Sequence, residues 1–111
     1  MTDRVVRDGQ VAVLISPGFG AGWSTWADPE YRPDVMFDPW IVDILLSKQY
    51  KKKEKLDRIM AHCNLKYPDM YTGGLSDLIV DWVPQGAWFR VTEYDGNESI
   101  ELKENNGWTQ A

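Results

Sequence analysis

The residues with the greatest chemical potential lie in one glycine-rich loop, residues 16–26, which directly follows the apolar run 11–15. Glycines at positions 18, 20 and 22 permit positive φ angles and let a partner molecule approach the main chain closely. Two indole rings and two hydroxyls follow them, in Trp23, Ser24, Thr25 and Trp26. Backbone N–H groups, hydroxyl donors and flat aromatic faces suit a ligand that carries a phosphate and a base. The loop therefore predicts a small-molecule pocket, but it names no ligand.

An alternative interpretation of this loop is structural: the glycines serve a tight turn, and both tryptophans belong to the core. The spacing also departs from known phosphate-binding motifs. Position 23 is Trp where the dinucleotide-binding motif has its third glycine, and the loop lacks the lysine that nucleotide triphosphatases use. Dehydrogenase chemistry and motor-type hydrolysis are therefore not expected.

A second loop, residues 71–74, repeats the pattern of an aromatic ring and a hydroxyl before glycines. If the chain re-enters the sheet at Leu78, this loop ends near the first one and forms the other wall of the same site. Arg32 and Arg90 are candidates for a bidentate phosphate contact. The predicted ligand-binding residues are Gly18, Phe19, Gly20, Gly22, Trp23, Ser24, Thr25, Trp26, Tyr71, Thr72, Gly73 and Arg90.

Size and charge limit the class of protein. A chain of 111 residues, 43% of them hydrophobic, is long enough for one domain, which we expect to span residues 1–111. The net charge of -5 argues against general nucleic-acid binding, because that affinity comes from neutralising phosphates. A lone cysteine, the lack of a signal segment and the short apolar runs predict a cytoplasmic protein without membrane contact.

Hydrophobic periodicity predicts an α+β fold, with one mixed or antiparallel sheet of about four strands and two helices packed on one face. The expected elements are a strand over 11–15, helices over 39–47 and 51–64, and strands over 78–83, 87–94 and 99–102. The unalternating strand 11–15 should be central and covered on both faces. Residues 27–34 should be irregular, and residues 84–86 should form a short hairpin connection.

Other polar groups carry weaker signals. The lysines that open the second helix, residues 51–55, resemble an anion-binding cluster, but such a run is more typical of a solvated helical face. His62 and Cys63 are adjacent helical positions that do not face each other, so no metal site is assigned. The carboxylates Asp81 and Glu93 lie near the last hairpin, where they would normally be solvated. No catalytic residue and no cofactor is predicted, and enzymatic activity is left open as the less favoured option.

Three segments, residues 11–26, 75–86 and 89–96, resemble a family of small, mostly uncharacterised bacteriophage proteins. The specific part is the loop sequence Ser-Pro-Gly-Phe-Gly-Ala-Gly-Trp-Ser-Thr-Trp. In size, acidity and loop character alone, the chain is also similar to small oligomeric phage sponges. Those proteins sequester nucleotide immune signals, such as cyclic dinucleotides or ADP-ribose derivatives made by CBASS or Thoeris defence. This likeness implies a homo-oligomer in the host cell cytosol, and it transfers no binding residues by position.

The sequence therefore favours a phage-encoded binding protein that sequesters a nucleotide-derived immune signal without turnover. A small hydrolase of the same signals is an alternative, with Asp81 and Glu93 as acid, base or metal ligands. Another alternative is an acidic protein–protein inhibitor of a host defence system, which the net charge of -5 permits.

Overall fold

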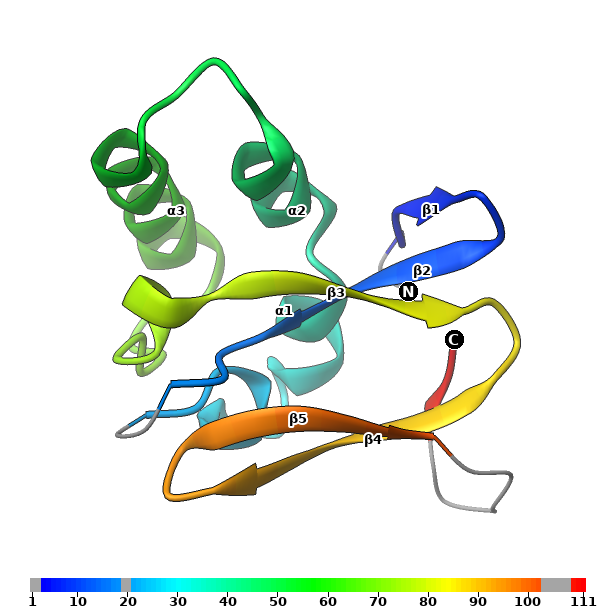
Figure 1. The fold of residues 1–111 in the computed structure, drawn as a ribbon. Helices are drawn as coiled ribbons and strands as arrows, with labels where there is room; N and C mark the ends of the chain where they lie inside the picture. The colour runs from blue at the N-terminus through cyan, green and yellow to red at the C-terminus, as the bar shows by residue number, and fades with distance from the viewer. Residues whose placement is uncertain (1–2, 19–20, 103–108) are drawn as a thin grey trace.

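The computed structural model describes residues 3–18, 21–102 and 109–111. Two helices, a first sheet and a second sheet form three layers (Figure 1). The first sheet has the antiparallel order β1-β2-β3, and the second has the antiparallel order β5-β4-β6. The strands are β1 (Val6–Arg7), β2 (Gln10–Ile15), β3 (Ile79–Pro84), β4 (Trp88–Tyr94), β5 (Asn97–Leu102) and β6 (Thr109–Gln110). The predicted α+β class is confirmed.

Strand β2 is central to the first sheet and buried on both of its faces, as predicted. Ala12 and Leu14 belong to the hydrophobic cluster on the helix side of the sheet. Val11, Val13 and Ile15 belong to a second cluster, which lies against the second sheet. Since alternate side chains of a strand point to opposite faces, a strand between two cores needs apolar residues at every position.

The predicted single sheet of about four strands is wrong, and so is the hairpin over residues 84–86. Strand β3 pairs with β2, whereas β4 pairs with β5 and β6, so the connection after β3 leads from one sheet to the other. In that connection the Gln85 N–H donates to the Gly9 carbonyl at 2.8 Å. Val83 and Phe89 lie on either side of it and are both buried between the sheets. The strands β3 and β4 therefore contact each other through packed side chains and do not pair through main-chain hydrogen bonds.

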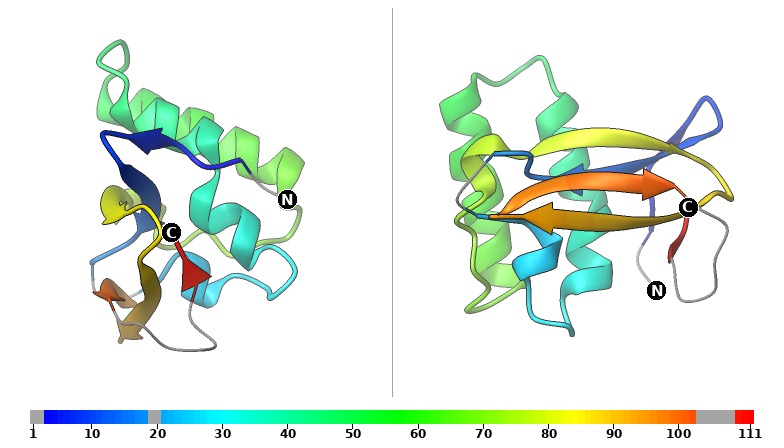
Figure 2. Two further views of the ribbon diagram at one scale, coloured as in Figure 1. Left: turned by 90° about the vertical axis from the view of Figure 1, so that its right-hand side faces the viewer. Right: turned by 60° about the horizontal axis from the view of Figure 1, so that its bottom comes forward.

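The two predicted helices are confirmed as α2 (Pro39–Leu46) and α3 (Lys52–Lys66), and they cover the face of the first sheet that lies away from the second sheet (Figure 2). Helix α2 begins at a true N-cap, because Asp38 Oδ1 accepts from the N–H groups of Trp40 and Ile41 at 3.0 and 3.3 Å. Pro39 occupies the first helical position, where its missing N–H costs nothing.

Residues 27–34 are more ordered than predicted, because a short helix, α1 (Arg32–Phe37), begins within them. Pro33 lies in its first turn, where proline is tolerated, and Val35, Met36 and Phe37 are buried. Two further single turns of 3₁₀ helix are η1 (Ser24–Trp26) and η2 (Leu75–Asp77). Within the part of the chain that the structure describes, no helix is long and apolar enough to cross a lipid bilayer.

Candidate functional site

The two glycine-bearing loops lie side by side, which confirms the proximity predicted from the sequence. The Ser16 hydroxyl donates to the Gly74 carbonyl at 2.8 Å. The Trp26 and Tyr71 rings stack with centroids 5.6 Å apart and planes 27° apart. A Cβ added to Gly74 would overlap the carbonyl of Gly22. The loops therefore touch through their main chains, and the glycine at position 74 serves this contact.

A buried carboxylate on β5 fixes the first loop in place. Glu98 is 1% exposed, and its Oε1 accepts from the Ser16 N–H at 2.8 Å. Its Oε2 accepts from the N–H and the hydroxyl of Thr25, at 3.0 and 2.6 Å. The Glu98 N–H in turn donates to the Ser16 carbonyl at 2.9 Å. These charge-assisted hydrogen bonds join both ends of the loop to the second sheet.

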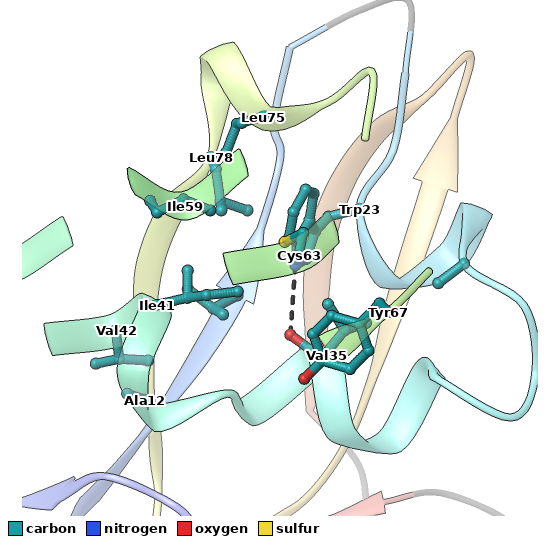
Figure 3. Close-up of a cluster of buried hydrophobic side chains, with 12 residues drawn as sticks. Ala12, Trp23, Val35, Ile41, Val42, Ile59, Cys63, Tyr67, Leu75 and Leu78 are labelled. Carbon is teal, nitrogen blue, oxygen red and sulfur yellow. Dashed lines mark hydrogen bonds between the residues drawn. The ribbon is translucent and has the colours of Figure 1, made fainter. Parts of the chain in front are cut away.

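The two tryptophans of the loop have different environments. Trp23 is 1% exposed, and its indole N–H donates to the Val35 carbonyl at 3.3 Å within the helix-side core (Figure 3). Its predicted role in stacking on a ligand is therefore corrected to a core role, as in the structural interpretation of the loop. Trp26 is 40% exposed, and its indole N–H donates to Glu93 at 3.4 Å. Of the two rings, that of Trp26 is open to a ligand.

Most of the remaining predicted residues already have partners within the chain. Thr25 is held by Glu98, Thr72 donates its hydroxyl to Met60 Sδ at 3.5 Å, and a Cβ on Gly73 would overlap the Tyr71 ring. A Cβ on Gly22 would lie 2.6 Å from the Thr25 hydroxyl oxygen. Ser24 is buried, and its hydroxyl has no hydrogen-bond partner among the described residues. Phe19 and Gly20 lie outside the described residues.

The two candidate arginines have partners within the chain. Arg90 lies on β4 and contacts Glu101 at 3.3 Å. Phe89 next to it is buried between the sheets, so the alternation of the strand directs Arg90 to the opposite face. Glu93, which contacts Trp26, lies on the same face of β4 as Phe89, so Arg90 and Glu93 lie on opposite faces of this strand. Arg32 donates to the carbonyls of residues 24 and 27 and thereby closes the η1 turn.

A cleft of about 580 Å³ opens at the start of the first loop, between α2, α3 and the chain that leads into β3. Its apolar lining comes from Pro17, Leu45, Leu56, Leu78 and Ile79. Its polar lining comes from Lys52, Lys55, Ser76 and Asp77. Among the described residues of the predicted site, Gly18 borders the cleft. The cleft therefore lies beside the loop contact and not between the loops.

The ammonium groups of the cleft lie at the start of α3. This helix has no side-chain N-cap, and its sequence opens with lysines at 51, 52, 53 and 55 and one acidic residue, Glu54. Cations at a helix N-terminus are unfavourable because the helix dipole is positive there. The Lys55 ammonium donates to the Leu45 carbonyl at 2.9 Å, which holds it at the wall of the cleft. A local positive region thus exists in a chain of net charge -5.

The sequence interpretation missed the lysines and Asp77 as cleft residues. Lysines at a helix start usually face solvent, and nothing in the local pattern shows that α2 and the entry to β3 pack beside them. Asp77 is linked to the predicted loop only by its contact with Gly18, because a Cβ at that glycine would overlap the Asp77 carboxylate. The missing side chain at position 18 makes room for a carboxylate of the same chain.

A separate polar network joins α2 to α3. The fully buried Asp38 accepts from the Tyr67 hydroxyl at 2.6 Å and contacts His62 Nε2 at 2.8 Å. Burial raises the pKa of Asp38, but the hydrogen bonds from Tyr67 and His62 outweigh it, so the pKa is lowered overall. The His62 ring also stacks on Trp40, with centroids 4.4 Å apart. Because Asp38 is the N-cap of α2, this network has a structural role.

The two carboxylates considered for hydrolysis have different hydrogen-bond partners in the structure. Asp81 lies on β3 in the first sheet, where it accepts from the Trp82 N–H at 2.9 Å. Glu93 lies on β4 in the second sheet and accepts from Trp26 and from the Gly96 N–H, the latter at 2.8 Å. Among the described residues, no group of three or more His, Cys, Asp and Glu side chains is arranged to hold a metal ion.

Comparison of the chain with protein-family models, with curated proteins and with solved structures finds no match.

Proposed function

We propose that the chain binds a small anionic ligand of the nucleotide class in the cleft beside Gly18 and holds it without turnover. The observation that carries this proposal is the pair of lysines, Lys52 and Lys55, in the lining of a cleft that also has five apolar residues. The volume of about 580 Å³ lies within the range of small-molecule sites.

The lining suggests how such a ligand would be oriented. Its phosphate would bind the ammonium groups of Lys52 and Lys55, where an anion also offsets the unfavourable charge at the start of α3. Its base would lie against apolar side chains, including those of Leu45, Leu56 and Ile79. Burial of a flat ring against such a wall contributes roughly 25 cal/mol per Å² of apolar surface.

The biological part of the proposal rests on the resemblance to phage proteins and sponges. The ligand would be a nucleotide-derived immune signal, such as a cyclic dinucleotide or an ADP-ribose derivative. The protein would act as a homo-oligomer in the host cell cytosol. The exposed Trp26–Tyr71 stack is the aromatic surface that the two loops offer to a ligand extending beyond the cleft.

A thermal-shift screen against mononucleotides, cyclic dinucleotides and ADP-ribose tests the proposal. A ligand that binds only the folded chain stabilises it by about 2.7 kcal/mol at a concentration one hundred times Kd. The proposal expects a rise in Tm with at least one nucleotide, and no rise with any of them would contradict it.

Heating the loaded protein and identifying the released compound then separates binding from catalysis. Intact ligand supports sequestration, whereas a hydrolysis product would establish the hydrolase alternative. Substitution of Lys52 by alanine should weaken binding. If the protein were instead an acidic inhibitor, no nucleotide would raise its Tm, and its function would require a protein partner.

A further inference from the structure

The cleft has two chemically different walls. On the α3 side, Lys52 and Lys55 offer hydrogen-bond donors and positive charge. On the η2 side, Asp77 offers a carboxylate and Ser76 a hydroxyl. A ligand that complements both walls must be anionic at one part and carry hydrogen-bond donors at another.

The position of Asp77 is supported by the neighbouring main chain. A Cβ at Gly18 would overlap Asp77 Oδ2, so the glycine leaves room for this carboxylate beside the loop. Among the described residues, the ion pairs join His62 and Lys66 to Asp38 and Arg90 to Glu101, and none joins Asp77 to the lysines of the cleft. Among these residues, the Asp77 carboxylate therefore forms no ion pair with the lysines that line the same cleft.

We infer that Asp77 accepts hydrogen bonds from the ribose hydroxyls of the ligand, so that the cleft selects ribonucleotides over 2′-deoxyribonucleotides. This inference rests on the proposed nucleotide-binding function. An ionised carboxylate is acceptor-only and repels phosphate, so it must face a donor group of the ligand. In a nucleotide, the donors nearest to the phosphate are the hydroxyls of the sugar. The lysine wall and the Asp77 wall together offer partners for a phosphate and for a ribose.

Isothermal titration of the whole chain with AMP, GMP and their 2′-deoxy counterparts tests this inference. The wild type should bind each ribonucleotide roughly tenfold to a hundredfold more tightly than its deoxy counterpart, as expected for hydrogen bonds to a charged group. In the variant Asp77→Asn this ratio should fall toward one. Binding of the deoxynucleotides and of inorganic phosphate should be unchanged or tighter, because a repulsive charge is removed.

The variant Asp57→Asn is the matched control, because Asp57 is exposed on α3 and does not line the cleft. It should keep the wild-type ratio. Equal affinity of the wild type for ribo- and deoxyribonucleotides would overturn the inference and leave the proposed function standing. A preference that follows guanine instead of the sugar would also overturn it. Binding of none of the four mononucleotides would also overturn the inference, and the thermal-shift screen with cyclic dinucleotides and ADP-ribose would then decide whether the proposed function stands.

Discussion

The substitution Glu98→Gln tests whether one buried carboxylate positions the loop that borders the cleft. Glutamine keeps the length of the side chain but replaces one carboxylate oxygen with an NH₂ group. Either the Ser16 N–H or the two donors of Thr25 would then face another donor. In the wild type these three hydrogen bonds measure 2.8, 3.0 and 2.6 Å, and Glu98 is only 1% exposed.

Loss of a hydrogen bond to a charged group costs about 1.5–3 kcal/mol, and an unpaired buried donor costs about 1–3 kcal/mol. We therefore expect the free energy of unfolding to fall by about 3 kcal/mol, out of roughly 5–15 kcal/mol for a domain. For a chain of this size the fall in Tm should be on the order of 10–20 °C.

Urea unfolding and thermal unfolding, both followed by circular dichroism, measure this effect. The matched control is Glu101→Gln on the same strand, because the ion pair of Glu101 with Arg90 is half exposed and worth at most about 1 kcal/mol. A loss of stability in Glu98→Gln no larger than that in Glu101→Gln would show that the buried carboxylate does not hold the loop in place.

Three further predictions concern the packing of the loops and the pH dependence of stability. Gly74→Ala should destabilise the chain by at least about 1 kcal/mol in urea unfolding, because the added methyl meets the carbonyl of Gly22; unchanged stability would contradict the loop contact. Asp38 has a pKa below its unfolded value of 3.8, so its contribution to stability is present above that pH and is lost as the pH falls through the folded pKa. Asp38→Asn keeps the helix cap and should reduce the fall in the free energy of unfolding at acid pH. An unchanged fall in this variant would show that Asp38 does not cause it. Burial raises the pKa of the Cys63 thiol to about 12, so its contribution to stability is fully present below pH 9.0 and is lost between there and the folded pKa. Iodoacetamide at pH 8.5 should therefore label Cys63 only after unfolding, and rapid labelling of the native chain would contradict its burial.

Much of the fold follows from local patterns in the sequence. The unbroken apolar run in β2 indicates burial on both faces, and Asp38 with Pro39 marks the start of α2. The separation of β3 from β4 could not be predicted in the same way. A short connection between two strands is compatible with a hairpin and with a step between sheets. Which of these two arrangements forms depends on how Val83 and Phe89 pack against residues distant in the sequence.

The candidate site was less predictable than the fold. The sequence indicated that the loops would meet, but it did not show that main-chain contact at Gly22 and Gly74 fills the space between them. Trp23 and Trp26 lie three residues apart in the same loop, and only the tertiary packing separates a core ring from an exposed one. The lysine wall of the cleft depends on the position of α3 beside residues far away in sequence, which no local pattern encodes.

Titration calorimetry of three proteins shows whether the cleft beside Gly18 binds an anionic ligand of the nucleotide class. These are the wild type, Lys52→Ala, and Lys53→Ala, whose lysine lies on the same turn of α3 but does not line the cleft. With the tightest ligand from the thermal-shift screen, we expect Lys52→Ala to lose roughly tenfold in affinity, corresponding to about 1.4 kcal/mol, and Lys53→Ala to lose far less. The affinity of the wild type should also fall as salt is added. Equal affinities of the three proteins, independent of salt, would contradict binding in this cleft.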